Sequence, residues 1–183
     1  MSGFPSLQHA FTVRVSKHSK INRPTFTNTA QLQSTAPYDV GNVATGGGLQ
    51  ITPIVTGTIK SEPGFEPALD VEVVYGSDYV RPEPGQTHLR TNVNAVIKNK
   101  DGAMLSYSYK GVVATDAGLM AILMTSPDAK TTDFGNAFTQ INIETGAEHL
   151  KDLEHSVFVG SAHFVIELGQ PMIIETKVSK VIK

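Results

Sequence analysis

One stretch of the sequence gathers polar side chains that could bind and activate a carbonyl compound. The acid Asp78 comes first, and Arg90, Asn92 and Asn94 follow at alternating positions. A carboxylate can take up a proton, whereas the neutral amides of the two asparagines can hold a carbonyl without transferring one. Arg90 would bind an enolate or a carboxylate, and all these groups act more strongly where water is excluded. We therefore take Asp78, Arg90, Asn92 and Asn94 as the candidate catalytic residues.

Each of these residues also has a simpler interpretation. The segment Gly76–Tyr79 has the composition of a turn, so Asp78 would accept backbone N–H groups at the junction of a strand and a loop. Asn92 and Asn94 lie two positions apart and would share the solvated outer face of a strand. Arg90 would then do no more than cover the exposed end of that strand.

A second set of residues could contact a substrate. The candidate substrate-binding residues are Tyr79, Ser106, Tyr107, Ser108, Tyr109, Met120, Phe158 and His163. His163 interrupts an otherwise apolar strand face, so it is either a hydrogen-bonded core histidine or a binding group. None of the six histidines has the spacing of a metal pair, and the chain has no cysteine. The sequence therefore predicts neither a metal site nor a cofactor.

Most of these residues belong to a hairpin from Leu89 to Gly111. Asp101-Gly102 between two alternating runs predicts a tight turn, with Gly102 in the left-handed conformation. The predicted register pairs Ile97 with Leu105, Ala95 with Tyr107, and Val93 with Tyr109. A slip of one residue would mix apolar and polar side chains on both faces, so the pattern favours this register.

The inward face of this hairpin decides which polar groups meet a ligand. If the polar face lines the interior, Asn92 and Asn94 meet a ligand beside Ser106 and Ser108. If the apolar face does, Tyr107 and Tyr109 become the hydrogen-bond donors and the asparagines face water. We expect Asn92 and Asn94 to face the interior.

The rest of the chain predicts an all-β fold, a single antiparallel β-barrel of the lipocalin-like kind with one or two short helices. Alternating or apolar runs with turn residues between them favour this architecture. The expected strands are 9–17, 49–60, 68–75, the two arms of the hairpin, 134–144, 156–168 and 172–182, with Gly57 as a bulge or a point of close approach. Helical segments are expected at 116–124, capped by Thr115 or Asp116, and at 147–154.

The whole chain, residues 1–183, is expected to form this one domain. Residues 1–8 are expected to be a loose tail, and residues 18–48 a long loop that serves as a lid or is a floppy insertion. The helix at 116–124 is apolar nearly all round, so it either plugs an opening or forms an interface between subunits.

Composition limits the classes of function. The 183 residues carry a net charge of −2, and the sequence shows no basic run beyond residues 14–20, so nucleic-acid binding is not expected. No signal peptide or membrane span is evident in the sequence. We therefore expect a cytoplasmic protein that binds an apolar small molecule and neither nucleic acid nor membrane, and a homo-oligomer is one alternative.

Five short motifs, in order, give the chain a family resemblance. They are Pro53–Thr58, Gly76–Tyr79, Lys100–Ala103 with Gly111, Glu144–Gly146 and Phe158–Gly160. In their order and spacing the chain resembles the small β-barrel proteins known as domain of unknown function 3237. The resemblance departs at the positions of Tyr79, Asn92 and Asn94, where the family has tryptophan and charged residues. It implies a link to fungal natural-product pathways, in which small cofactor-free barrels act as cyclases, including Diels–Alder-type catalysts.

Three functions follow as hypotheses. The first is a cofactor-free cyclase or isomerase that folds an apolar, oxygenated substrate into a reactive shape and donates hydrogen bonds to its carbonyl. The second is a small-molecule binding protein without turnover. The third is a structural subunit that associates through the helix at 116–124.

Overall fold

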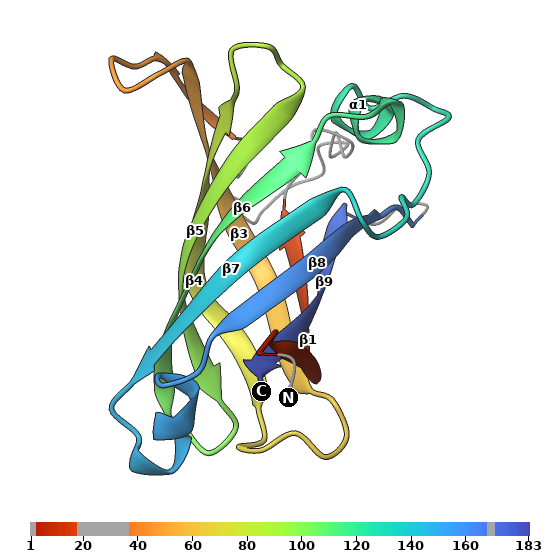
Figure 1. Cartoon of the computed structure of the whole chain (residues 1–183). Coiled ribbons are helices and arrows are strands. Elements are labelled where there is room, and N and C mark those ends of the chain that lie inside the picture. Colours follow the sequence, from red (N-terminus) through yellow and green to blue (C-terminus); the bar gives the residue numbers. More distant parts are fainter. Residues whose placement is uncertain (1–2, 18–36, 168–170) are drawn as a thin grey trace.

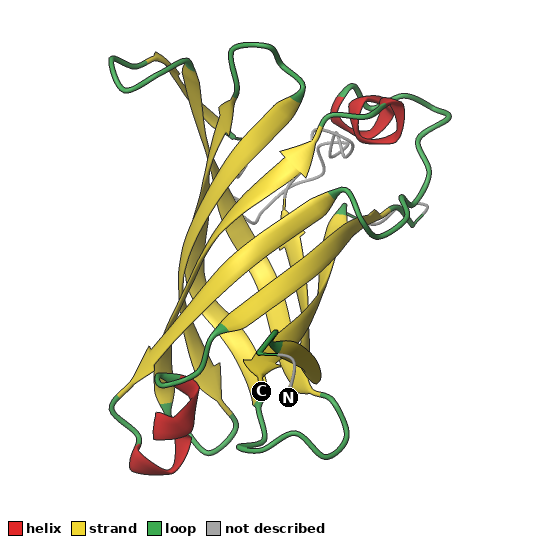
Figure 2. Cartoon of the chain, in the orientation of Figure 1, coloured by secondary structure: helices red, strands yellow, loops and turns green. Residues whose placement is uncertain are grey.

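The computed structural model describes residues 3–17, 37–167 and 171–183, which form one antiparallel sheet of nine strands (Figures 1 and 2). The strands are β1 (Ser6–Lys17), β2 (Tyr38–Asn42), β3 (Gly48–Ser61), β4 (Asp70–Pro82), β5 (His88–Asn99), β6 (Met104–Ala114), β7 (Ala137–Thr145), β8 (Phe158–Val165) and β9 (Ile173–Ile182). Their order is β1-β9-β8-β7-β6-β5-β4-β3-β2, and β1 also pairs with β3. This last pairing closes the sheet, so the predicted antiparallel barrel is confirmed.

The described residues add two short helices. The α-helix α1 (Ala117–Leu123) follows β6 and lies at one end of the barrel, and the 3-10 helix η1 (Glu148–Leu153) lies at the other (Figure 1). Asp116 caps α1, because its carboxylate accepts a hydrogen bond from the Leu119 backbone N–H at 2.8 Å. No helix in the described ranges is long and apolar enough to span a membrane.

The β5–β6 hairpin has the predicted register. Ile97 lies opposite Leu105, Ala95 opposite Tyr107, and Val93 opposite Tyr109. Gly102 has a φ of +91°, which a residue with a Cβ rarely adopts. The apolar face of the hairpin points into the barrel, because these side chains complete the hydrophobic core.

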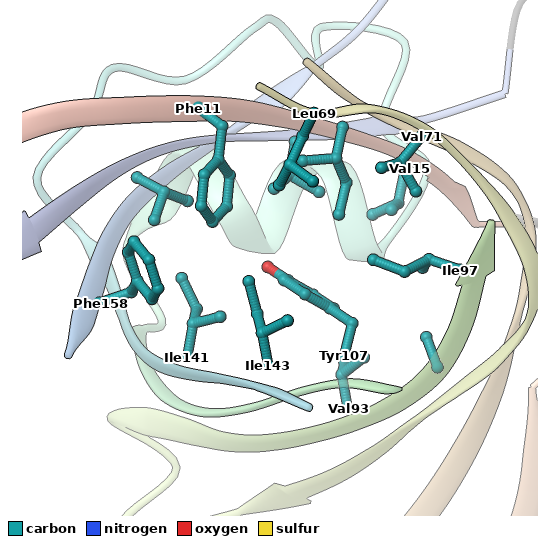
Figure 3. Close-up of a cluster of buried hydrophobic side chains, with 14 of the residues drawn as sticks. Phe11, Val15, Leu69, Val71, Val93, Ile97, Tyr107, Ile141, Ile143 and Phe158 are labelled. Atoms are coloured by element: carbon teal, nitrogen blue, oxygen red, sulfur yellow. The ribbon is translucent and has the colours of Figure 1, made fainter. Parts of the chain in front are cut away.

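That core fills the end of the barrel near η1. Phe11, Phe65 and Phe158 contact one another with ring centroids 5.3 to 6.3 Å apart, and Leu150 and Leu153 of η1 are buried beside the same cluster. Figure 3 shows the Tyr107 hydroxyl pointing into the middle of these hydrophobic side chains. The opposite end, near α1, is therefore the one available to a ligand.

Strand β4 is longer than the sequence predicted. The expected turn at Gly76–Tyr79 is part of the strand, which continues to Pro82. A Cβ on Gly76 would lie 3.0 Å from the Cβ of Ala95 and 3.1 Å from Cδ1 of Ile54, so this glycine allows close packing instead of a turn. Asp78 consequently lies inside a strand and not at a strand–loop junction.

Two further boundaries differ from the prediction. Strand β1 begins at Ser6, so the last residues of the predicted tail are part of the sheet. The predicted loop at 18–48 includes β2, which pairs with the first residues of β3. Residues 18–36, which the lid hypothesis concerns most, lie outside the described residues.

Gly57 of β3 is a point of close approach, as predicted. A Cβ there would lie 2.8 Å from Cγ1 of Val15 and 2.8 Å from Cγ2 of Val73. We expect Gly57→Ala to lower the free energy of unfolding by about 1–3 kcal/mol, because the extra methyl group overpacks the barrel wall. Gly48→Ala is the matched control in the same strand, since the nearest atom, Oδ1 of Asn42, would be 3.9 Å from its Cβ. Equal urea midpoints for the two variants would contradict this account.

Candidate functional site

A cavity of about 1040 Å³ occupies the end of the barrel near α1. We call it the mouth cavity. Its walls are inward-facing side chains of β3 to β9 together with one side of α1, among them Thr52, Asp78, Thr91, Tyr109, Leu119, Thr139, Phe164 and Ile174. The volume lies near the upper end of the range for pockets that take a drug-sized molecule.

Asp78 lies at the buried side of the mouth cavity. Its side chain reaches the interior because β4 contains a β-bulge between Val73 and Tyr75. The extra residue at the bulge exchanges the inward and outward positions of the strand beyond it. Asp78 therefore lies on the same inner face as Val71 and Val73, although it is an odd number of residues away from both. Asp78 is only 1% exposed, and the Thr91 hydroxyl donates a hydrogen bond to its carboxylate.

Tyr109 places a second polar group in the same part of the cavity. Burial raises the pKa of Tyr109 well above its usual value, and the charge of Asp78 and the neighbouring Tyr107 raise it further. A hydrogen bond with Thr91 acts in the opposite direction. The Tyr109 hydroxyl therefore keeps its proton at neutral pH. Thr91 gives its one hydroxyl proton to Asp78, so Tyr109 is the donor in its hydrogen bond with Thr91, and it can donate to a ligand that replaces Thr91 as its partner.

Tyr107 belongs to the core and not to the mouth cavity. It is 3% exposed, and its ring meets that of Tyr109 edge-on, with centroids 6.0 Å apart. Burial raises the pKa of its hydroxyl. The two tyrosines thus share a face of β6 but have different surroundings.

The raised pKa values predict a loss of stability at alkaline pH. Above about pH 10 the unfolded chain releases its tyrosine protons, whereas folded Tyr107 and Tyr109 keep theirs, so rising pH favours unfolding. Each buried tyrosine should contribute up to about 1.4 kcal/mol per pH unit to this loss. Urea midpoints at pH 8 and pH 11 should therefore differ less for Tyr107→Phe than for the parent chain. An equal difference would contradict the buried position of this hydroxyl.

Apolar side chains of α1 form part of the cavity wall near its opening. Leu119 and Ile122 of α1 are each 2% exposed, and both line the cavity, as does Met120. The segment after α1 is tied to β8, because the Thr132 backbone N–H donates to the Phe164 carbonyl oxygen at 3.0 Å. These contacts support the interpretation of α1 as a cover of the barrel opening.

Threonines are the inward-facing residues that the sequence did not single out. Thr52, Thr91 and Thr176 are buried, and Oγ1 of Thr139 is buried without a hydrogen-bond partner among the described residues. All four line the mouth cavity. The sequence could have predicted Thr91 as an inward-facing residue, because it lies two positions before Val93 on the face that also carries Ala95 and Ile97.

The expectation that Asn92 and Asn94 face the interior is wrong. Both lie on the outer face of β5, where Asn92 is partly exposed and Asn94 is exposed. Asn94 lies opposite Ser108 and Asn92 opposite Lys110. Arg90, Ser106 and Ser108 also point outward, since the core requires the alternate positions of this hairpin for Val93, Ala95 and Ile97.

The other predicted residues are divided among three places. Tyr79 points outward because the bulge turns Asp78 inward, Phe158 is in the core at 0% exposure, and Met120 lies at the mouth cavity. His163 lies on the outer wall, stacked on Phe134 with ring centroids 4.0 Å apart. Its Nδ1 is 2.9 Å from the carbonyl oxygen of Thr132.

The arrangement brings together one carboxylate and two hydroxyl groups, from Asp78, Thr91 and Tyr109, in a cavity that is otherwise lined by apolar side chains, further threonines and a few other polar residues. Within the described ranges, no three His, Asp or Glu side chains are grouped closely enough to hold a metal ion. The three oxygen groups can accept a proton, donate hydrogen bonds to a carbonyl, or do both.

Several solved structures resemble this barrel. A conserved protein of unknown function from Rhodopseudomonas palustris is 18% identical, with a TM-score of 0.69 and 100% of each chain covered. A β-barrel-like protein from Acinetobacter baumannii is 17% identical, with a TM-score of 0.66 and 99% of this chain and 98% of that one covered. An enzyme from Penicillium herquei is 13% identical, with a TM-score of 0.58 and 97% and 94% covered.

These likenesses show the fold, and the sequence itself shows the family. A comparison with curated proteins gave no match. The family model described as protein of unknown function (DUF3237) matches residues 5–181, which is nearly the whole chain. The chain therefore belongs to the DUF3237 family.

Proposed function

We propose that the mouth cavity binds an apolar, oxygenated small molecule and catalyses its cyclisation or isomerisation without a cofactor. One observation carries this proposal. The Asp78 carboxylate, hydrogen-bonded by Thr91, lies with the Tyr109 hydroxyl at the buried side of a largely apolar cavity of about 1040 Å³. Such a site can orient a ligand by its apolar surface and polarise it at one end.

The apolar walls would hold the substrate in a compact shape. Val113, Leu119 and Phe164 offer hydrophobic surface, and burial of each Å² of apolar ligand surface contributes about 25 cal/mol. Holding two reacting parts of one molecule in contact lowers the entropic part of a cyclisation barrier. This step needs no proton transfer, so it suits a Diels–Alder-type ring closure.

The polar groups would act on the electronic part of the barrier. A hydrogen bond from Tyr109 to a substrate carbonyl would stabilise negative charge that develops on its oxygen. For an isomerisation, Asp78 would take a proton from the carbon beside that carbonyl and return it at another carbon, which leaves the composition of the molecule unchanged. Thr91 would hold the Asp78 carboxylate in place during both steps.

The comparisons support catalysis more than binding alone. The solved barrel from Penicillium herquei is described as an enzyme, and it covers nearly the same length as this chain. The family resemblance in the sequence also implies cyclases. A protein that only binds its ligand is the alternative, and the same cavity would serve it.

The test is turnover without added cofactor. Pure protein is incubated with a panel of reactive polyenes, quinone methides and β,γ-unsaturated ketones, and product formation is compared with that in buffer. We expect at least one substrate to be converted faster by the parent chain than by buffer or by Asp78→Asn. Tight association without product across the panel would favour the binding protein instead.

A further inference from the structure

A second concave surface lies on the outside of the barrel. We call it the outer trough. It has a volume of about 1140 Å³ and is lined mainly by outward-facing residues of β4 to β9, with Leu7, His9 and Glu62 at the end near β9. It crosses the strands, because Arg90, Val112, Phe138 and Ser161 are successive cross-strand neighbours on its floor. With strands about 4.8 Å apart, the trough follows an arc of roughly 24 Å around the barrel wall from β4 to β9. The outer trough is therefore long enough for an extended molecule that follows the curve of the wall.

The middle of the outer trough is apolar. Phe138 is 57% exposed there, with Val112 and Val159 on the neighbouring strands. When an apolar group of a ligand covers exposed apolar side chains of this kind, the free energy of the complex is lowered. The middle of the trough would thus accept a hydrocarbon chain or a ring.

The end of the trough on β4 to β6 carries positive charge. Arg81 lies directly opposite Arg90 across the two strands, and like charges in that position repel. Glu83 binds Arg90, with 2.5 Å between the Arg90 Nε and the Glu83 Oε1, but no carboxylate of a described residue pairs with Arg81 or Lys110. The Nε atom of Arg81 is buried and has no hydrogen-bond partner among the described residues.

The opposite end of the trough is closer to neutral. There Lys177 pairs with Glu62, with 3.3 Å between Nζ and Oε1, and Glu62 also accepts a hydrogen bond from Thr12. The trough is therefore polarised, with its uncompensated cations at Arg81 and Lys110 and its apolar surface between the two ends.

From this polarity we infer that the outer trough binds an elongated apolar carboxylate. Its carboxylate would lie against Arg81 and Lys110, where a guanidinium offers paired donors, and its apolar part would cover Phe138 and Val159. The site is distinct from the mouth cavity, because its side chains occupy the outward positions of the same strands. Thr91 and Thr139 line both the outer trough and the mouth cavity, so a single layer of sheet separates the trough from the cavity.

The probes are 6-phenylhexanoate and its neutral counterpart 6-phenylhexan-1-ol, titrated calorimetrically into the full chain. We expect the carboxylate to bind at least about tenfold more tightly, because the alcohol lacks the charge-assisted hydrogen bonds. Arg81→Gln and Lys110→Gln should each weaken the carboxylate about five- to tenfold and leave the alcohol unchanged. Lys98→Gln is the matched control, since Lys98 is exposed on the outer face of β5 but does not line the trough.

Backbone amide NMR during the same titration locates the probe. Shift changes are expected at Arg81, Asn92 and Lys110. Changes confined to Val80, Leu89 and Val113 would place the carboxylate in the mouth cavity and overturn the inference. Equal binding of the two probes, or unchanged carboxylate binding by both glutamine variants, would also overturn it.

Discussion

Asp78→Asn should reduce kcat for the proposed isomerisation by about 10³-fold, within the range for losing a general base. Asparagine has nearly the same shape, and its amide oxygen can still accept the hydrogen bond that Thr91 donates to Asp78. It cannot take up a proton and carries no negative charge. The expected loss is therefore in the chemical step, with KM changed only a few-fold.

The measurement compares steady-state rates of the parent chain, Asp78→Asn and Glu72→Gln. Glu72 lies on β4 as well, but its side chain is exposed on the outer face, so its substitution removes the same charge without touching the cavity. Urea denaturation shows whether each variant is folded. A folded Asp78→Asn protein with parent-like kcat would remove Asp78 from the proposed mechanism, although a Diels–Alder-type ring closure guided only by shape would survive.

The sequence was informative where local physics decides structure. The Asp101-Gly102 turn requires a positive φ, and the alternation on both sides of it tolerates no other register, so the hairpin was predictable residue by residue. The sequence predicts a cap by Thr115 or Asp116 for a similar reason, because the first turn of a helix needs an acceptor for its N–H groups, and the structure shows that Asp116 supplies it.

The predicted inward face of the hairpin is wrong because packing, and not the position of polar residues, decides it. The family resemblance implies charged residues at the positions of Asn92 and Asn94, and this favours a ligand-binding role. The barrel needs Val93, Ala95 and Ile97 inside to contact Phe11, Phe158 and their neighbours in the core, and that requirement decides the face. The apolar side of a hairpin is the safer guide to the inside of a small barrel.

Asp78 lines the mouth cavity, but it lies inside β4 and not in the predicted turn. Strict alternation from Val71 places position 78 outside, and only the bulge at Val73–Tyr75 reverses it. A bulge depends on contacts with both neighbouring strands, so the sequence of β4 alone does not reveal it. Thr91 and Tyr109 follow from the hairpin register once the inward face is known.

Tyr109→Phe should lower kcat by about 10²-fold, which is typical of losing one hydrogen bond that strengthens in the transition state. Tyr107→Phe is the matched control, because it removes the same kind of hydroxyl group two residues away on the same face, but from the hydrophobic core.

Because the pKa of Tyr109 is raised by burial, by the Asp78 charge and by Tyr107, the hydroxyl remains a donor throughout neutral and mildly alkaline conditions. The rate of the parent chain should then show no loss through tyrosine ionisation between pH 7 and about pH 10, where a tyrosine of ordinary pKa would be about half ionised. Rates from pH 6 to pH 10 for the three proteins measure both effects, and an equal fall of kcat in the two phenylalanine variants would mean that Tyr109 acts only through packing.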